Sequence, residues 1–73
     1  MTPIQCKMAR TATGITVRKL GEITGLAFST INRYENTGKA NITTINKMKE
    51  ALESAGVEFI PKNGGGPGVR LKE

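Results

Sequence analysis

Apolar residues recur every three or four positions through residue 56 of the chain and then alternate with polar ones. The first spacing is typical of amphipathic helices, and the second is typical of strands with one buried face. The pattern therefore predicts four helices followed by two short strands. We expect residues 1–56 to form one helical domain and residues 57–73 to form a C-terminal β-ribbon.

The start of the first helix is marked by Thr2, Pro3 and Gln5. A Thr at the N-cap with Gln three residues later makes a capping box, and Pro is favoured at the first helical position. The helix should end near Gly14. Cys6 is expected to be a small, partly buried filler that lies off the buried stripe of this helix. The members of that stripe are expected to be Ile4, Met8, Ala12 and Ile15.

Two short helices joined by a tight turn are predicted next. Thr16 is the expected cap of a helix of about eight residues that ends at Gly25, and a further helix should run from about Phe28 to Asn36. Gly21 costs a helix about 1 kcal/mol relative to Ala, so we expect it to mark close contact with another helix. The first of these helices carries apolar residues at spacings of three, namely Val17, Leu20 and Ile23. The inward residues of the second are expected to be Leu26, Ile31 and Tyr34.

The last part of the chain changes from helical to strand-like periodicity. Thr43 is the predicted cap of a fourth helix that ends at Gly56, and its apolar residues are Ile45, Met48, Leu52 and Ala55. Residues 57–60 and 69–72 then alternate with period two and predict strands. The loop of residues 62–68 holds four Gly and a Pro. It lacks the Gly-Lys-Ser/Thr ending and the following helix of a P-loop, so a hairpin connection is the better interpretation.

Basic residues are concentrated in the helical part of the chain. The 73 residues include 11 Lys and Arg against 6 Glu and no Asp, a net charge of +5. Residues 1–49 carry eight basic and two acidic side chains, a net of +6, whereas residues 50–73 carry three and four, a net of −1. This asymmetry favours a polyanion such as nucleic acid or an anionic lipid surface, although a solvated basic face has the same composition.

The composition argues against catalysis and metal binding. With no His and one Cys, the chain cannot assemble a structural zinc site or an Asp/His-assisted nucleophile. We therefore expect no enzyme activity, no metal, no cofactor and no small-molecule ligand. The lone thiol fits a reducing cytoplasm. We expect no membrane span and no secretory signal, because no apolar run of 18 residues and no charged-then-apolar leader is found.

The segment from Thr16 to Gly38 has the pattern of a DNA-binding helix-turn-helix. It resembles the phage-repressor and Cro-like (XRE) family in Gly25-Leu26, in Ser29-Thr30-Ile31-Asn32-Arg33-Tyr34-Glu35-Asn36 and in Gly38. Residues 2–56 are similar to the first four helices of that family. The resemblance implies a mainly α, four-helix lambda-repressor-like domain. A short ribbon here follows where family members usually have a fifth helix.

The resemblance also implies which side chains meet the bases of DNA, namely Phe28, Ser29, Asn32 and Arg33. The chemistry agrees in part, because Arg can pair with guanine, Asn can pair with adenine, and Phe can touch a thymine methyl. Phe28 can instead be a buried staple, and Asn32 and Arg33 can be solvated helix residues.

Phosphate contacts are implied on both sides of this helix. Family members often carry polar side chains at the positions of Val17 and Ala27, so anchoring in this chain is expected to shift to other groups. The expected groups are Arg18, Lys19, Asn36 and Lys39 together with backbone N–H groups at helix starts. The resemblance further implies a structural ion pair between Arg10 and Glu35, which would remove an acidic group from the DNA-facing helix.

These features predict a cytoplasmic, nucleoid-associated regulator that binds double-stranded DNA as a homodimer, with residues 28–36 in the major groove of a palindromic operator. The dimer contacts are expected from Val57, Phe59, Ile60, Val69 and Leu71 of the ribbon. An alternative is a protein-interaction module, such as an antitoxin or regulatory partner, whose ribbon extends another protein's sheet. Non-specific binding to RNA or to a membrane is less well supported, because the aromatic residues form no stacking platform and the charge is spread over several helices.

Overall fold

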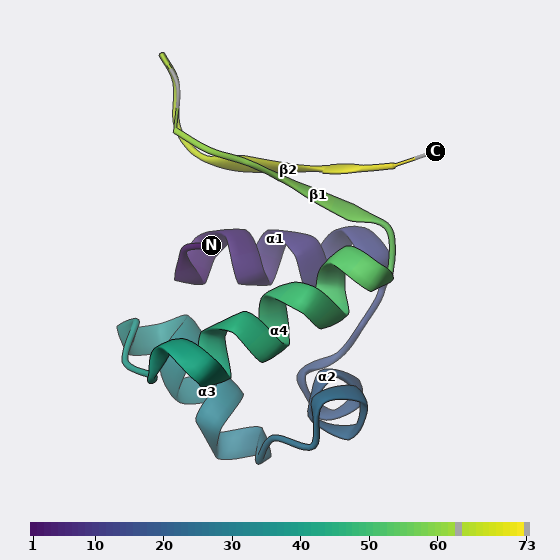
Figure 1. Ribbon diagram of the computed structural model, residues 1–73, viewed down its shortest axis with the longest axis vertical. Coiled ribbons are helices and arrows are strands. Elements are labelled where there is room, and N and C mark those ends of the chain that lie inside the picture. The colour runs from purple at the N-terminus through teal and green to yellow at the C-terminus, as the bar shows by residue number, and fades with distance from the viewer. Residues whose placement is uncertain (63, 73) are drawn as a thin grey trace.

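The computed structural model describes residues 1–62 and 64–72. Across these residues the chain forms four helices followed by a two-stranded antiparallel ribbon, which confirms the predicted fold class (Figure 1). The ribbon lies against α1 at one end of the molecule, and α2 and α3 lie at the other end. The elements are α1 (Pro3–Thr13), α2 (Val17–Thr24), α3 (Phe28–Thr37), α4 (Ile42–Ser54), β1 (Val57–Ile60) and β2 (Gly68–Leu71).

Local capping signals determine where the helices begin. The capping box of α1 is present, because Thr2 Oγ1 accepts from Gln5 N at 3.2 Å and Gln5 Oε1 accepts from Thr2 N at 2.8 Å. The prediction that Thr43 caps α4 is wrong. Asn41 is the N-cap, and its Oδ1 accepts from Thr44 N at 2.8 Å. Asn at the N-cap satisfies one of the free N–H groups of the first turn, so α4 starts before Thr43 and includes it.

The buried face of α1 differs from the predicted stripe. Ile4 is 55% exposed and Ala12 is also exposed, whereas Met8 and Ile15 are half-buried. The fully enclosed side chains of this helix are Gln5, Cys6 and Ala9. Small residues at Cys6 and Ala9 allow other helices to approach α1 closely, and this packing decides the orientation of α1 more than the spacing of its larger apolar residues does. Cys6 is therefore a core residue, not a partly buried filler.

The core lies where α1, α3 and α4 meet the base of the ribbon. Its buried hydrophobic residues are Cys6, Ala9, Leu20, Ile31, Tyr34, Met48, Leu52 and Val57. Ile45 is half-buried at the edge of this cluster, but Ala55, also predicted as an inward residue of α4, is exposed and lies at the C-cap. Val57 comes from β1, so the ribbon contributes to the core of the helical domain.

Cross-strand pairing sorts the ribbon residues onto two faces. The pairs are Val57 with Leu71, Glu58 with Arg70, Phe59 with Val69 and Ile60 with Gly68. Opposite residues share a face and successive residues alternate. The apolar face therefore carries Val57, Phe59, Val69 and Leu71, while Glu58 and Arg70 form an ion pair at 3.1 Å on the other face. Of the connecting loop, Asn63 lies outside the described residues.

Gln5 fastens the ribbon to α1. Its Nε2 donates to Ile60 O and to Gly68 O, each at 3.0 Å. These two carbonyls belong to the cross-strand pair next to the loop, so one side chain from α1 bonds both strands. Gln5 as a whole is 4% exposed, and its other side-chain polar atom, Oε1, accepts the capping-box hydrogen bond from Thr2 N. Gln5 thus combines a local cap with a long-range anchor.

Candidate nucleic-acid interface

A close approach at Gly21 sets the angle between α2 and α3. A Cβ at this position would lie 2.9 Å from Leu26 O and 3.8 Å from Ile31 Cδ1. The expectation of a close contact is confirmed, although the backbone partner is the turn between the helices and not a helix. The turn itself needs Gly25, whose φ of +76° is in the left-handed region that glycine adopts without strain.

The inner face of α3 is held by two buried residues, as predicted. Ile31 is fully enclosed, and Tyr34 is 2% exposed with its hydroxyl donating to Met1 O at 2.9 Å. Burial raises the pKa of this hydroxyl, so it remains the neutral donor that the contact needs. The orientation of α3 is therefore fixed from the side opposite to its polar face.

The outer face of α3 brings together the predicted base-contacting residues. Phe28 is 57% exposed, so the alternative of a buried staple is wrong. Ser29 and Arg33 are exposed and Asn32 is half-buried on the same helix. An apolar ring, a hydroxyl, an amide and a guanidinium thus lie within the first two turns of α3. These groups are chemically suited to contact the edges of base pairs in a major groove.

Glu35 is the acidic residue of α3, and it is turned away from this face. It is 7% exposed, and the implied ion pair with Arg10 is present, with Arg10 Nε 2.6 Å from Glu35 Oε2 and Arg10 Nη2 2.7 Å from Glu35 Oε1. Burial alone would raise the pKa of this carboxyl, but hydrogen bonds from Arg10 and Cys6 outweigh burial and hold its pKa below the usual value. A charged, paired carboxylate therefore lies inside the protein, where it does not oppose a phosphate backbone.

Cys6 completes this buried cluster. Its Sγ lies 3.2 Å from Glu35 Oε2 and donates to it. Burial, together with the hydrogen bond to Glu35, raises the pKa of the thiol to about 12. The side chain is thus an uncharged donor to the ion pair and is not a reactive thiolate.

The residues expected to contact phosphate flank α3. Arg18, Lys19, Asn36 and Lys39 are all exposed. Lys19 lies 3.8 Å from Glu22 in an exposed pair, which leaves its ammonium largely available to solvent. Ala27, the N-cap of α3, has no side chain that can cap the helix. The first backbone hydrogen bond of α3 runs from Thr30 N to Ala27 O at 3.0 Å. The first N–H groups of α3 are therefore left for water or an external acceptor.

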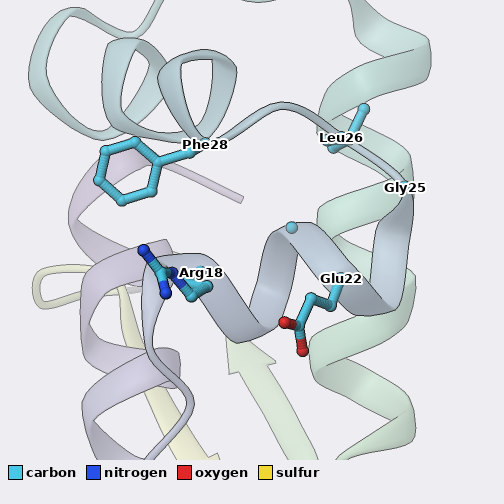
Figure 2. A pocket seen from close by; sticks show the side chains of 6 residues that line it. Arg18, Glu22, Gly25, Leu26 and Phe28 are labelled. Atoms are coloured by element: carbon cyan, nitrogen blue, oxygen red, sulfur yellow. The ribbon is translucent and has the colours of Figure 1, made fainter.

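A groove of about 590 Å³ lies between α2 and the start of α3 (Figure 2). Its lining residues are Arg18, Gly21, Glu22, Gly25, Leu26 and Phe28. In Figure 2 the Arg18 guanidinium points toward the Phe28 ring, and Glu22 projects from the next turn of α2. Glu22 is not among the site residues predicted from the sequence. Its position four residues after Arg18 was visible in the sequence, but the groove itself depends on the crossing of two helices.

The five ribbon residues predicted to contact a second chain differ in how exposed they are. Val57 is fully buried in the chain's own core, so the prediction that it contacts a second chain is wrong for this fold. Phe59 and Val69 are partly buried against the same core, and Ile60 is half-buried. Leu71 is 47% exposed at the end of β2. What the ribbon offers to a partner is therefore its strand edge, the half-buried Ile60 and the exposed Leu71 at the end of its apolar face, while Val57, Phe59 and Val69 pack against the chain's own core.

The part of the chain that is described contains no cluster of metal-binding side chains and no membrane-spanning helix. Within residues 1–62 and 64–72, no three His, Cys, Asp or Glu side chains are grouped so that they could hold a metal ion. The helices of these same residues are too short or too polar to cross a bilayer.

The comparisons with known proteins give no family assignment: no protein-family model and no curated protein matches the sequence. Membership of the XRE family therefore stays a prediction that depends on the residues of the helix-turn-helix.

Proposed function

We propose that this protein binds double-stranded DNA in a sequence-specific way, as a homodimeric transcriptional regulator of the XRE type. In this proposal α3 enters the major groove with Phe28, Ser29, Asn32 and Arg33 toward the base edges. A helix fits this groove, which is about 12 Å wide. Two copies related by a two-fold axis would contact the two halves of a palindromic operator.

The observation that carries the proposal is the distribution of charge on α3. Its carboxylate, at Glu35, is enclosed and bound by Arg10, whereas its cation, at Arg33, is exposed. An exposed carboxylate on this helix would repel phosphates. A buried carboxylate without a cation beside it would destabilise the fold. The Arg10–Glu35 pair avoids both costs, so the outer face of α3 presents only neutral and positive groups.

Phosphate binding would come from the exposed groups beside α3. Arg18 and Lys19 lie on α2, and Asn36 and Lys39 lie at or just beyond the end of α3. Cations on both sides of the inserted helix can bond the backbones that border the major groove. Each phosphate contact adds about 0.9 to the slope of log affinity against log salt concentration, so this part of the interface can be measured separately from base recognition.

The outer edge of β2, with which no further strand of the described residues pairs, supports the proposed homodimer. Lys72 N donates to Gly56 O at 2.7 Å, and bonded and non-bonded pairs alternate along an antiparallel ribbon. Val69 and Leu71 therefore direct their backbone groups away from β1. Pairing of β2 with its two-fold mate would satisfy these groups and would cover the exposed part of Leu71.

DNA binding is tested by selection from a random duplex library at moderate salt, with the wild type and Arg33→Ala. We expect a palindromic consensus for the wild type and loss of definition at one position in each half-site for the variant. Lys62→Ala is the matched control, because it removes one exposed cation that follows β1, in the ribbon at the opposite end of the molecule from α3. Uniform enrichment of all sequences would overturn the proposal of specific binding.

The dimer is tested by sedimentation of Leu71→Lys beside Ile42→Lys. Both substitutions place a cation at an exposed apolar residue, but Ile42 lies at the start of α4 and is 69% exposed. We expect only Leu71→Lys to shift the mass from dimer to monomer, since like charges would meet at the two-fold axis. A wild type that is monomeric and binds no duplex at low salt would instead favour the alternative, a protein-interaction module whose ribbon extends a partner's sheet.

A further inference from the structure

The groove between α2 and α3 combines groups that do not suit a phosphate. Arg18 and Glu22 are both exposed and lie one helical turn apart, and together they bring a cation and a carboxylate to the same groove. Among the described residues no ion pair within 4.0 Å joins them, and the Glu22 carboxylate lies 3.8 Å from Lys19 Nζ in an exposed pair that leaves it accessible to solvent. A carboxylate repels a phosphate, so this pair is better matched to a neutral surface that carries both donors and acceptors.

A guanine–cytosine pair presents such a surface in the major groove. Guanine offers the acceptors O6 and N7, which an Arg bonds bidentately, and cytosine offers the N4 amino group, which a Glu accepts. Arg18 and Glu22 together hold these complementary groups in one groove, so a single base pair can use both side chains.

Phe28 adds an apolar contact next to this polar pair. Its ring is 57% exposed at the first position of α3, and Leu26 forms the half-buried apolar part of the same groove. The guanidinium of Arg18 points toward the ring (Figure 2). A base-pair step that offers a guanine beside a methyl group would therefore fit both side chains. Thymine carries such a methyl on C5.

We propose that the groove recognises a 5-methylpyrimidine–guanine step in each half-site. Phe28 covers the C5 methyl, Arg18 donates to O6 and N7 of the guanine, and Glu22 accepts from N4 of the paired cytosine. This inference rests on the proposed function but moves Arg18 from the phosphate contacts proposed above to base recognition, and it leaves those contacts to Lys19, Asn36 and Lys39. Because 5-methylcytosine carries the same C5 methyl as thymine, TG and methylated CG steps both offer the methyl contact at this position, and unmethylated CG and UG steps lack it.

The methyl contact is tested with two pairs of duplexes built on the selected operator, thymine against uracil opposite adenine and 5-methylcytosine against cytosine opposite guanine, so that the members of each pair differ only in the C5 methyl. We expect wild-type affinity to fall about fourfold on loss of the methyl from either methylated base. With Phe28→Ala, the two members of each pair should be bound equally, because the apolar contact is gone. Equal binding of thymine and uracil by the wild type would overturn the inference, and so would a methyl effect that survives in Phe28→Ala.

The guanine contact is tested by placing 7-deazaguanine, which lacks the N7 acceptor, at the same step. The wild type should lose at least about fivefold in affinity, and Arg18→Ala should show no additional loss with this base. Lys39→Ala is the matched control, since it removes an exposed cation expected to contact phosphate but does not line the groove, whereas Lys19 pairs with the groove residue Glu22 at 3.8 Å. It should weaken binding to all duplexes by the same factor and keep the full 7-deazaguanine effect.

The two proposals fail in distinguishable ways. If the library yields a palindromic operator but no TG or methylated CG step is selected, or the modified bases change nothing, specific DNA binding stands and the assignment of the groove is wrong. If no duplex is enriched at all, both the proposed function and this inference fall.

Discussion

Arg10 and Glu35 form a bidentate ion pair that joins α1 to α3, with two N to O distances of 2.6 and 2.7 Å. The Glu35 side chain is 2% exposed and that of Arg10 is 18% exposed, so water competes little for the pair. The geometry is the planar, two-bond arrangement in which Arg binds a carboxylate best. The pair therefore fixes the position of α3 relative to the rest of the domain.

Removal of the Arg10 side chain should destabilise the fold. We expect Arg10→Met to lower the free energy of unfolding by about 3 kcal/mol, because the carboxylate of Glu35 is left enclosed without its cation. Chemical denaturation measures this loss. The matched control is Arg70→Met, which breaks an exposed pair with Glu58 at 3.1 Å and should change the stability little. Lower DNA affinity in Arg10→Met without any loss of stability would contradict the structural role.

Glu35 should also make the stability depend on acid pH. Its pKa in the folded state is lowered, so its contribution is complete above the unfolded-state pKa of about 4.3 and is lost as pH falls through the lower folded pKa. Urea denaturation between neutral and acid pH should thus show a fall in stability that begins near pH 4 and continues below it. Glu35→Gln should be less stable at neutral pH and show a shallower fall, whereas Glu53→Gln, at an exposed position, should follow the wild type.

Gly21 gives a prediction that runs against helix propensity. Ala is better than Gly in a helix by about 1 kcal/mol, but a Cβ at Gly21 would lie 2.9 Å from Leu26 O, a backbone atom. We expect Gly21→Ala to be less stable than the wild type and to bind DNA more weakly, because α2 and α3 must separate. Gly65→Ala is the control, since a Cβ there meets nothing within 4 Å. A rise in melting temperature for Gly21→Ala would show that the contact relaxes without cost.

The features that the sequence predicted well depend on neighbouring residues. Thr2 and Gln5 make their capping box within one helical turn, and the left-handed turn after α2 needs only a glycine, Gly25, at that position. Both features could therefore be predicted from the local sequence alone. The start of α4 was missed because Asn41 and Thr43 are both good caps, and local chemistry alone did not separate them.

The features that the sequence did not predict depend on distant partners. The stripe containing Ile4 was chosen for side-chain size, but α1 packs through the smaller Cys6 and Ala9. The burial of Gln5 follows from its bonds to carbonyls 55 and 63 residues away. The groove that contains Arg18 and Glu22 likewise exists only once α2 and α3 have crossed.

Gln5 should prove to be the side chain that holds the ribbon in place. Gln5→Glu keeps the shape but replaces the Nε2 donor with an oxygen that faces Ile60 O and Gly68 O. We expect a loss of about 2–3 kcal/mol at neutral pH, partly recovered on acidification because the protonated carboxyl can again donate. Thr2→Ala should lose only about 1 kcal/mol, since it removes the cap but leaves both bonds to the ribbon. Denaturation at pH 7 and pH 5, with amide exchange of the ribbon, measures these effects, and wild-type stability in Gln5→Glu would show that the ribbon is held by its apolar face alone.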